Sequence, residues 1–261
     1  MKKNVVTQSQ ANIISYIDGL GSSENTKLAV LNVAINMRKH FKKEVNKLNT
    51  RKLQLTDDYQ VQKNEKKETN KNDLPTSKEL IAWENRQYID GNWVAFIVTH
   101  LLRVLSTRNK DLDLKIVPAN RSLRKVGKDD KNNYLILRKN SSQVVRSDYK
   151  TFKQYGTLKN VIQSRKMNKA IRELIAERDL ILGKDTINLL STKGGEKMNE
   201  ESIAKKIRSY TFRGLSESDY NKVFVSEVAT LKDLKKLEKI SKNRGTSLEV
   251  LLKEYHINID V

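Results

Sequence analysis

The chain has 261 residues with 51 Lys or Arg and 31 Asp or Glu, which gives a formal net charge of +20 at pH 7. Cysteine is absent and the three histidines are scattered, which excludes disulfides and thiolate metal sites and argues against a histidine metal site. No apolar run approaches the roughly 18 residues that cross a bilayer, and the start MKKNVVTQSQ lacks a signal-peptide core, so a soluble, intracellular protein is expected.

The first predicted elements form a small helical unit. Apolar residues recur at helical spacing in QSQANIISYIDGL (8–20) and again over 26–48. The following stretch DDYQVQKNEKKETNKNDLPTS (57–77) is polar, charged and nearly devoid of apolar residues, which is typical of a linker. We therefore predict a helical N-terminal domain over 1–60 and a polar linker over 61–77.

The remainder, 78–261, is predicted to be mostly helical with a small sheet. An apolar helical stretch covers 78–105, and segments rich in Val, Ile and Tyr at 113–118, 133–139 and 142–150 predict strands, the last two joined by a KNSS hairpin turn. Further helices are expected at 157–182, 199–213, 216–230 and 231–243. The predicted fold class is mainly α with a small antiparallel sheet.

Positive charge is spread along the whole chain. Residues 1–73 carry 14 basic and 8 acidic side chains, and residues 74–261 carry 37 and 23. A distributed positive field of this kind is typical of proteins that bind a polyanion, where phosphate contacts and counterion release supply affinity. The charge therefore predicts a nucleic acid as the partner rather than an anionic membrane surface.

Two segments before residue 157 contain basic residues that are candidates for a functional site. In VLSTRNKDLDLKIV (104–117), Arg108 lies between the apolar helical stretch over 78–105 and the first predicted strand. SDYKTFKQYG (147–156) lies at the end of the predicted hairpin. Lys150 is the first candidate in it for a site lysine, and Lys153 is the second.

Two further segments lie near the C-terminus. LSESDYNKVFVSE (215–227) is a predicted helix that ends in an aliphatic, an aromatic and Val-Ser-Glu. In NRGTSLEVLLKEYH (243–256), Ser247 follows Gly245 by two residues and Tyr255 follows it by ten.

In this order, the four segments resemble the motifs of the tyrosine recombinase (phage-integrase-like) family, most closely the divergent recombinases of large DNA viruses and mobile elements. The resemblance covers 78–260 and implies a helical core-binding domain before it. It also implies double-stranded DNA as the partner, with no small-molecule substrate and no cofactor. It implies Arg108 as a phosphate clamp, Lys150 as the proton donor to the leaving oxygen and Tyr255 as the nucleophile of DNA recombination or integration. Such chemistry needs neither metal nor nucleotide, because the bond energy stays in a covalent phosphotyrosine intermediate.

The sequence departs from the family pattern at three positions. Asn221 and Lys222 stand where the family has its second arginine and a histidine, and Thr246 stands where it has the histidine after glycine. Loss of one charge-stabilising donor typically costs about 3–4 kcal/mol of transition-state stabilisation. Neighbouring cations that could compensate are Lys222, Arg213 and Arg244.

The expected function is therefore DNA binding by a recombinase-like fold whose catalysis has decayed. The first alternative is an active recombinase that cleaves and rejoins DNA through a 3′-phosphotyrosine, and the second is a basic nucleoprotein that coats nucleic acid without specificity. RNA binding is disfavoured because no sheet motif interleaves aromatic and basic residues. The resemblance implies that assembly, often into tetramers, would occur through exchange of the C-terminal tail. INIDV, which follows His256, is short for such an exchange, so we expect a monomer in solution and leave self-assembly on DNA open.

Overall fold

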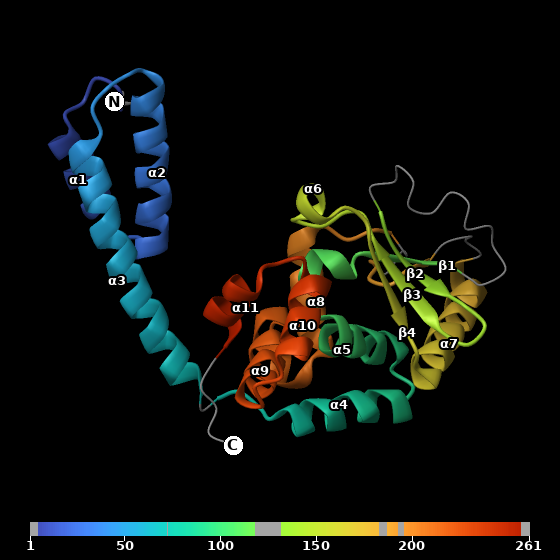
Figure 1. Ribbon diagram of the computed structural model, residues 1–261. Coiled ribbons are helices and arrows are strands. Elements are labelled where there is room, and N and C mark those ends of the chain that lie inside the picture. The colour runs from blue at the N-terminus through green and yellow to red at the C-terminus, as the bar shows by residue number, and fades with distance from the viewer. Residues whose placement is uncertain (1–4, 72, 118–131, 183–186, 193–195, 257–261) are drawn as a thin grey trace. The chain divides into compact units, whose positions relative to one another are not determined.

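The structure is a computed structural model that describes residues 5–71, 73–117, 132–182, 187–192 and 196–256 (Figure 1). The chain divides into two compact units, Met1–Asp73 and Leu74–Val261. In the part of the chain that the structure describes, no helix combines the length and apolar character that crossing a membrane requires.

The smaller unit consists of three helices, α1 (Gln10–Asp18), α2 (Glu24–His40) and α3 (Asn46–Lys71). The side chains of Ser9 and Ser23 cap the first two helices, and the apolar faces meet in one core. The helix predicted over 26–48 is interrupted after His40, where Lys42 adopts a φ of +54°. Much of the segment predicted as a linker, 61–77, is helical because α3 continues to Lys71.

The larger unit is built around the apolar helix α5 (Trp93–Leu105). Helices α4 (Ser77–Ile89), α7 (Arg165–Leu182), α8 (Glu200–Tyr210) and α9 (Glu217–Thr230) all contact α5, as Figure 1 shows. Nine of the thirteen residues of α5 are buried, which is expected for a helix that is apolar on nearly all sides. Helices α10 (Leu234–Arg244) and α11 (Leu248–Tyr255) pack on α9 around a separate cluster of Val225, Leu237 and Leu251.

The sheet has five strands in the order β4-β3-β2-β1-β5. Their bounds are Leu114–Val117 (β1), Asn133–Leu137 (β2), Ser142–Arg146 (β3), Leu158–Ile162 (β4) and Ile187–Asn188 (β5). The predicted hairpin is confirmed, since β2 and β3 pair antiparallel from Tyr134–Val145 to Leu137–Ser142.

Two predictions about this unit are wrong. The sheet is mixed rather than wholly antiparallel, because β1 and β2 run parallel from Leu114–Asn133 to Val117–Ile136. The helix predicted over 157–182 begins only at Arg165, and the residues before it form β4, which pairs with β3. Short elements complete the unit: the 3-10 helices η1 (Asn109–Leu112) and η3 (Phe212–Gly214), and α6 (Phe152–Tyr155).

Candidate functional site

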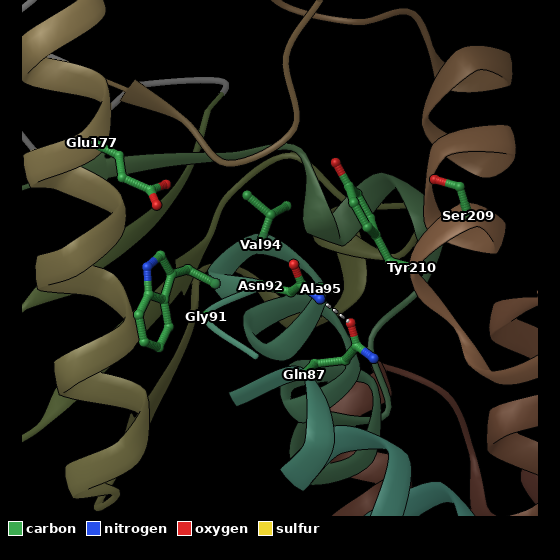
Figure 2. Close-up of a pocket in the computed structure, with 9 residues that line it drawn as sticks. Gln87, Gly91, Asn92, Val94, Ala95, Glu177, Ser209 and Tyr210 are labelled. Atoms are coloured by element: carbon green, nitrogen blue, oxygen red, sulfur yellow. Dashed lines mark hydrogen bonds between the residues drawn. The ribbon is translucent and has the colours of Figure 1, made fainter. Parts of the chain in front are cut away.

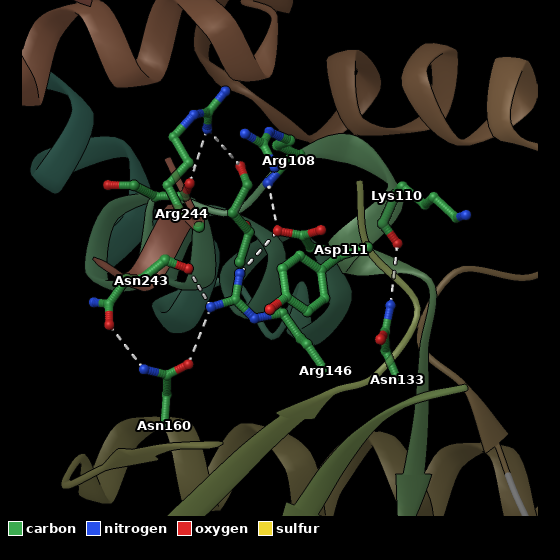
Figure 3. Close-up of polar contacts among 12 residues, drawn as sticks. Arg108, Lys110, Asp111, Asn133, Arg146, Asn160, Asn243 and Arg244 are labelled. Carbon is green, nitrogen blue, oxygen red and sulfur yellow. Dashed lines mark hydrogen bonds and ion pairs between the residues drawn. The ribbon is translucent and has the colours of Figure 1, made fainter. Parts of the chain in front are cut away.

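The first and fourth motif segments meet at one guanidinium group, that of Arg244 at the end of α10. Its Nη1 donates to the carbonyl oxygens of Ser106 (2.8 Å) and Thr107 (3.5 Å), immediately before Arg108. Its Nη2 donates to the hydroxyl oxygen of Tyr255 at 2.5 Å. Arg244 is only 2% exposed, so this cation is held inside the unit rather than in solvent. Figure 3 shows Arg244 with Arg108, Asp111 and Arg146.

Tyr255 is the last residue of α11 and is held by the helices beneath it. The hydroxyl of Ser247 caps the helix start by accepting from the backbone N–H of Val250, and Tyr255 packs against the cluster shared by α9, α10 and α11. Its backbone oxygen accepts a hydrogen bond from Ser226, and the Arg244 guanidinium lies 4.5 Å from its ring centroid. The phenol oxygen is therefore fixed beside a positive charge.

Gly245 brings the second motif segment to the fourth. It ends α10 in the left-handed conformation with a φ of +62°, which favours glycine. A Cβ at this position would lie 2.7 Å from Oγ1 of Thr151 and 3.0 Å from the ring of Tyr149. The Thr151 hydroxyl donates to the Gly245 carbonyl at 2.7 Å, so backbone and side chain approach closely here.

Lys150 lies in sequence between Tyr149 and Thr151, and its side chain is exposed. It lies in the turn after β3 rather than on the strand, which ends at Arg146, and Lys153 lies in α6 and is also exposed. Burial raises the pKa of Tyr149, whose hydroxyl donates to the Gly156 carbonyl at 2.6 Å. Tyr149 is therefore a buried, neutral packing residue.

Arg108 is half-buried at the start of η1. Its backbone N–H donates to Oδ2 of Asp111 at 3.1 Å. Within the described ranges, the Nη1 atom of its side chain is buried and has no hydrogen-bond partner. Because a buried unpaired donor is costly, this guanidinium is suited to an incoming acceptor such as a phosphate oxygen.

Figure 3 shows a further buried arginine, Arg146, near Arg108 and Asp111; the sequence did not single it out. Its Nη1 donates to Oδ2 of Asp111 at 2.8 Å, and its Nη2 donates to Oδ1 of Asn160 at 3.1 Å and to the Asn243 carbonyl. Arg146 and Asp111 are both fully buried. Because Arg146 bonds both Asp111 in η1 and the Asn243 carbonyl in α10, it links η1 to the end of α10. The signal in the sequence is a lone charge in the apolar strand SQVVR.

The third segment contributes an amide and a carboxylate. Asn221, buried on α9, donates through Nδ2 to the Glu217 carbonyl at 2.9 Å and to its Oε1 at 3.0 Å. The same Oε1 accepts from Nη2 of Arg244 at 2.5 Å. Glu217 was not predicted as a site residue; its one signal in the sequence is its position four residues before Asn221.

The other substituted positions lie in different contacts. Lys222 forms an ion pair with Asp219 at 3.2 Å. Burial of Asp219 favours the protonated carboxyl, but hydrogen bonds from Ser216 and the charge of Lys222 outweigh it and hold the pKa of Asp219 below its usual range. Arg213 is exposed and lies over the Phe212 ring at 4.8 Å. The half-buried Thr246 accepts through its carbonyl from Ser241. Of the three cations suggested as substitutes, the structure brings Arg244 to Tyr255.

A separate pocket of about 450 Å³ lies among α4, α5, α7 and α8 (Figure 2). Gln87, Asn92, Trp93, Glu177 and Tyr210 are among its lining residues, and Asn92 donates to Gln87 at 3.1 Å. The residues that line it do not belong to the four motif segments. It is therefore distinct from the site around Arg244.

The solved structures that match the chain include one described as "Crystal structure of XerA recombinase". The similarity has a TM-score of 0.45 and 14% sequence identity and covers 98% of this chain and 81% of that one. No family model and no curated protein matches the chain. At this TM-score the likeness assigns neither a family nor an activity to the chain.

Proposed function

We propose that this chain binds double-stranded DNA and that its larger unit holds a backbone phosphate at the site formed by Arg108, Arg244 and Tyr255, with Lys150 at its edge. The observation that carries the proposal is the Arg244 guanidinium, which donates to the Tyr255 hydroxyl at 2.5 Å and to the carbonyls that precede Arg108. Segments more than 130 residues apart in sequence thus meet at the Arg244 guanidinium, a planar charged donor of the kind that binds phosphate oxygens.

The net charge of +20 supports the same proposal, because phosphate contacts from Lys and Arg dominate DNA affinity. We expect duplex binding to weaken steeply with salt, with a log–log slope of about −5 or steeper, since each neutralised phosphate contributes about −0.9. Fluorescence anisotropy with a labelled duplex measures this slope. A slope near zero, or no binding at low salt, would contradict the proposal.

A second candidate function, strand cleavage and rejoining, is favoured by the same contact. In that reaction the Tyr255 oxygen attacks a phosphodiester, a phosphorus–oxygen bond to tyrosine forms, and the bond to the 5′ oxygen breaks. The Tyr255 phenol gives up its proton to solvent, and the leaving 5′ oxygen takes a proton, for which Lys150 is the proposed donor, so no net proton is gained or lost. Arg108 and Arg244 would clamp the non-bridging oxygens, with Arg244 in the role that the substituted position Asn221 has lost.

Covalent trapping tests this second candidate. Nicked duplexes that cannot religate are incubated with the full chain and separated on denaturing gels. If the site is active, a protein–DNA adduct forms with the native chain and is absent with Tyr255→Phe. Tight, salt-sensitive binding without any adduct would leave DNA binding as the function and remove the cleavage reaction.

A further inference from the structure

The carboxylate of Glu217 lies among the groups proposed to hold a phosphate. Its Oε1 accepts from Nη2 of Arg244 at 2.5 Å and from Nδ2 of Asn221 at 3.0 Å. The same Nη2 donates to the Tyr255 hydroxyl oxygen at 2.5 Å. The carboxylate oxygen of Glu217 and the hydroxyl oxygen of Tyr255, the residue in the nucleophile position, therefore accept from the same Arg244 nitrogen.

These donors are suited to a phosphate oxygen as well as to a carboxylate oxygen. Guanidinium groups form similar short, charge-assisted hydrogen bonds with both anions. The Glu217 side chain is 11% exposed and that of Arg244 is 2% exposed, so each charge needs a partner in the unliganded chain. Glu217 supplies that partner for Arg244.

We propose that Glu217 is an internal substitute for the DNA phosphate: its carboxylate occupies the anion position between Arg244, Asn221 and Tyr255, and a phosphate binds there by displacing it. The inference rests on the proposed function, because it identifies what already occupies the proposed phosphate site. It also assigns Asn221 a role, since this residue still donates to an anion where the resemblance places an arginine.

The local structure allows the carboxylate to move without the helix. Glu217 is the first residue of α9, and the helix start is capped independently by Ser216 and Asp219 in a capping box. The side chain can therefore rotate toward solvent while the backbone of α9, and Asn221 with it, stays in place.

Substitution Glu217→Gln tests the proposal in the full chain, with Glu227→Gln as the matched control. Glu227 is exposed on the same helix, so both variants change the net charge equally. The readout is the unfolding temperature against inorganic phosphate concentration, with ionic strength held constant by sodium chloride. We expect the apparent phosphate affinity of Glu217→Gln to be about tenfold higher than that of the native chain and of Glu227→Gln, since one opposing charge at the site is removed. Equal phosphate responses in all three proteins would overturn the proposal.

Glu217→Asp provides a second variant in case the Gln variant does not fold. Asp keeps the negative charge at the helix start, which favours α9, but is one methylene shorter and withdraws from Arg244. A phosphate response above that of the native chain is expected although the net charge is unchanged. A response equal to the native one would contradict displacement.

Duplex DNA binding is measured on the same proteins, so that failure of this inference can be distinguished from failure of the proposed function. If Glu217→Gln gains phosphate affinity but neither it nor the native chain binds duplex DNA, the anion site stands and the proposed function fails. If all the proteins bind duplex DNA and phosphate acts on them equally, DNA binding stands and the role of Glu217 is overturned.

Discussion

Replacing Arg244 with Met is expected to lower the free energy of unfolding of the larger unit by about 3–5 kcal/mol, the usual cost of breaking a buried ion pair. The substitution leaves Glu217, 11% exposed, with only the Asn221 amide, and it removes the donor to the Tyr255 hydroxyl. Trp83 and Trp93, the two tryptophans of the chain, both lie in this unit, so their fluorescence during urea unfolding reports on it alone.

The double variant Arg244→Met/Glu217→Leu provides the control. Because the two charges are removed together, we expect it to lose clearly less than the sum of the two single variants. A loss below about 1 kcal/mol for Arg244→Met would be that of an ordinary substitution and would show that the pair does not organise the site.

Replacing Arg146 with Met is expected to have a similar effect, again about 3–5 kcal/mol. Asp111 is fully buried and would keep only the backbone N–H of Arg108 as a donor, while Asn160 and the Asn243 carbonyl lose theirs. Because Asn243 directly precedes Arg244, duplex affinity should fall as well.

The matched control for this prediction is Arg138→Met, which removes an exposed arginine from the turn that follows β2. Exposed substitutions usually change stability by less than about 0.5 kcal/mol. If urea unfolding gave Arg146→Met and Arg138→Met the same stability, the buried network would not hold η1 and α10 together.

The helices of the larger unit could be predicted from apolar spacing, but some boundaries and the sheet pairing could not. The apolar run of α5 was evident, as was the hairpin of β2 and β3. The strand β4 leads into the helical pattern of α7 with no glycine or proline between them, so the two were merged. The parallel pairing of β1 with β2 depends on the path of the chain between them, which local composition does not encode.

Some residues of the candidate site could likewise be predicted from the local sequence, whereas others depend on contacts between distant parts of the chain. Arg108, Lys150 and Tyr255 were predicted from motif order, and Arg244 from its closeness to a substituted motif. Arg146 was missed because a single arginine is ordinarily a surface residue, whereas its burial depends on Asp111, 35 residues earlier, and on Asn243, 97 residues later. The contact of Glu217 with Arg244 joins residues 27 positions apart and could not be predicted from the local sequence either.

The measurement that tests the central claim most directly is duplex DNA binding by Arg108→Gln across a salt series, beside the native chain and Arg86→Gln. Arg86 is an exposed arginine of α4 outside the motif segments, so both variants lose one positive charge. We predict that Arg108→Gln lowers affinity roughly ten- to a hundredfold, as loss of a charged hydrogen bond of about 1.5–3 kcal/mol implies, and that the salt slope falls by about 1. Equal affinities and slopes for the two variants would contradict a phosphate site at Arg108 and would favour a basic protein that coats nucleic acid without specificity.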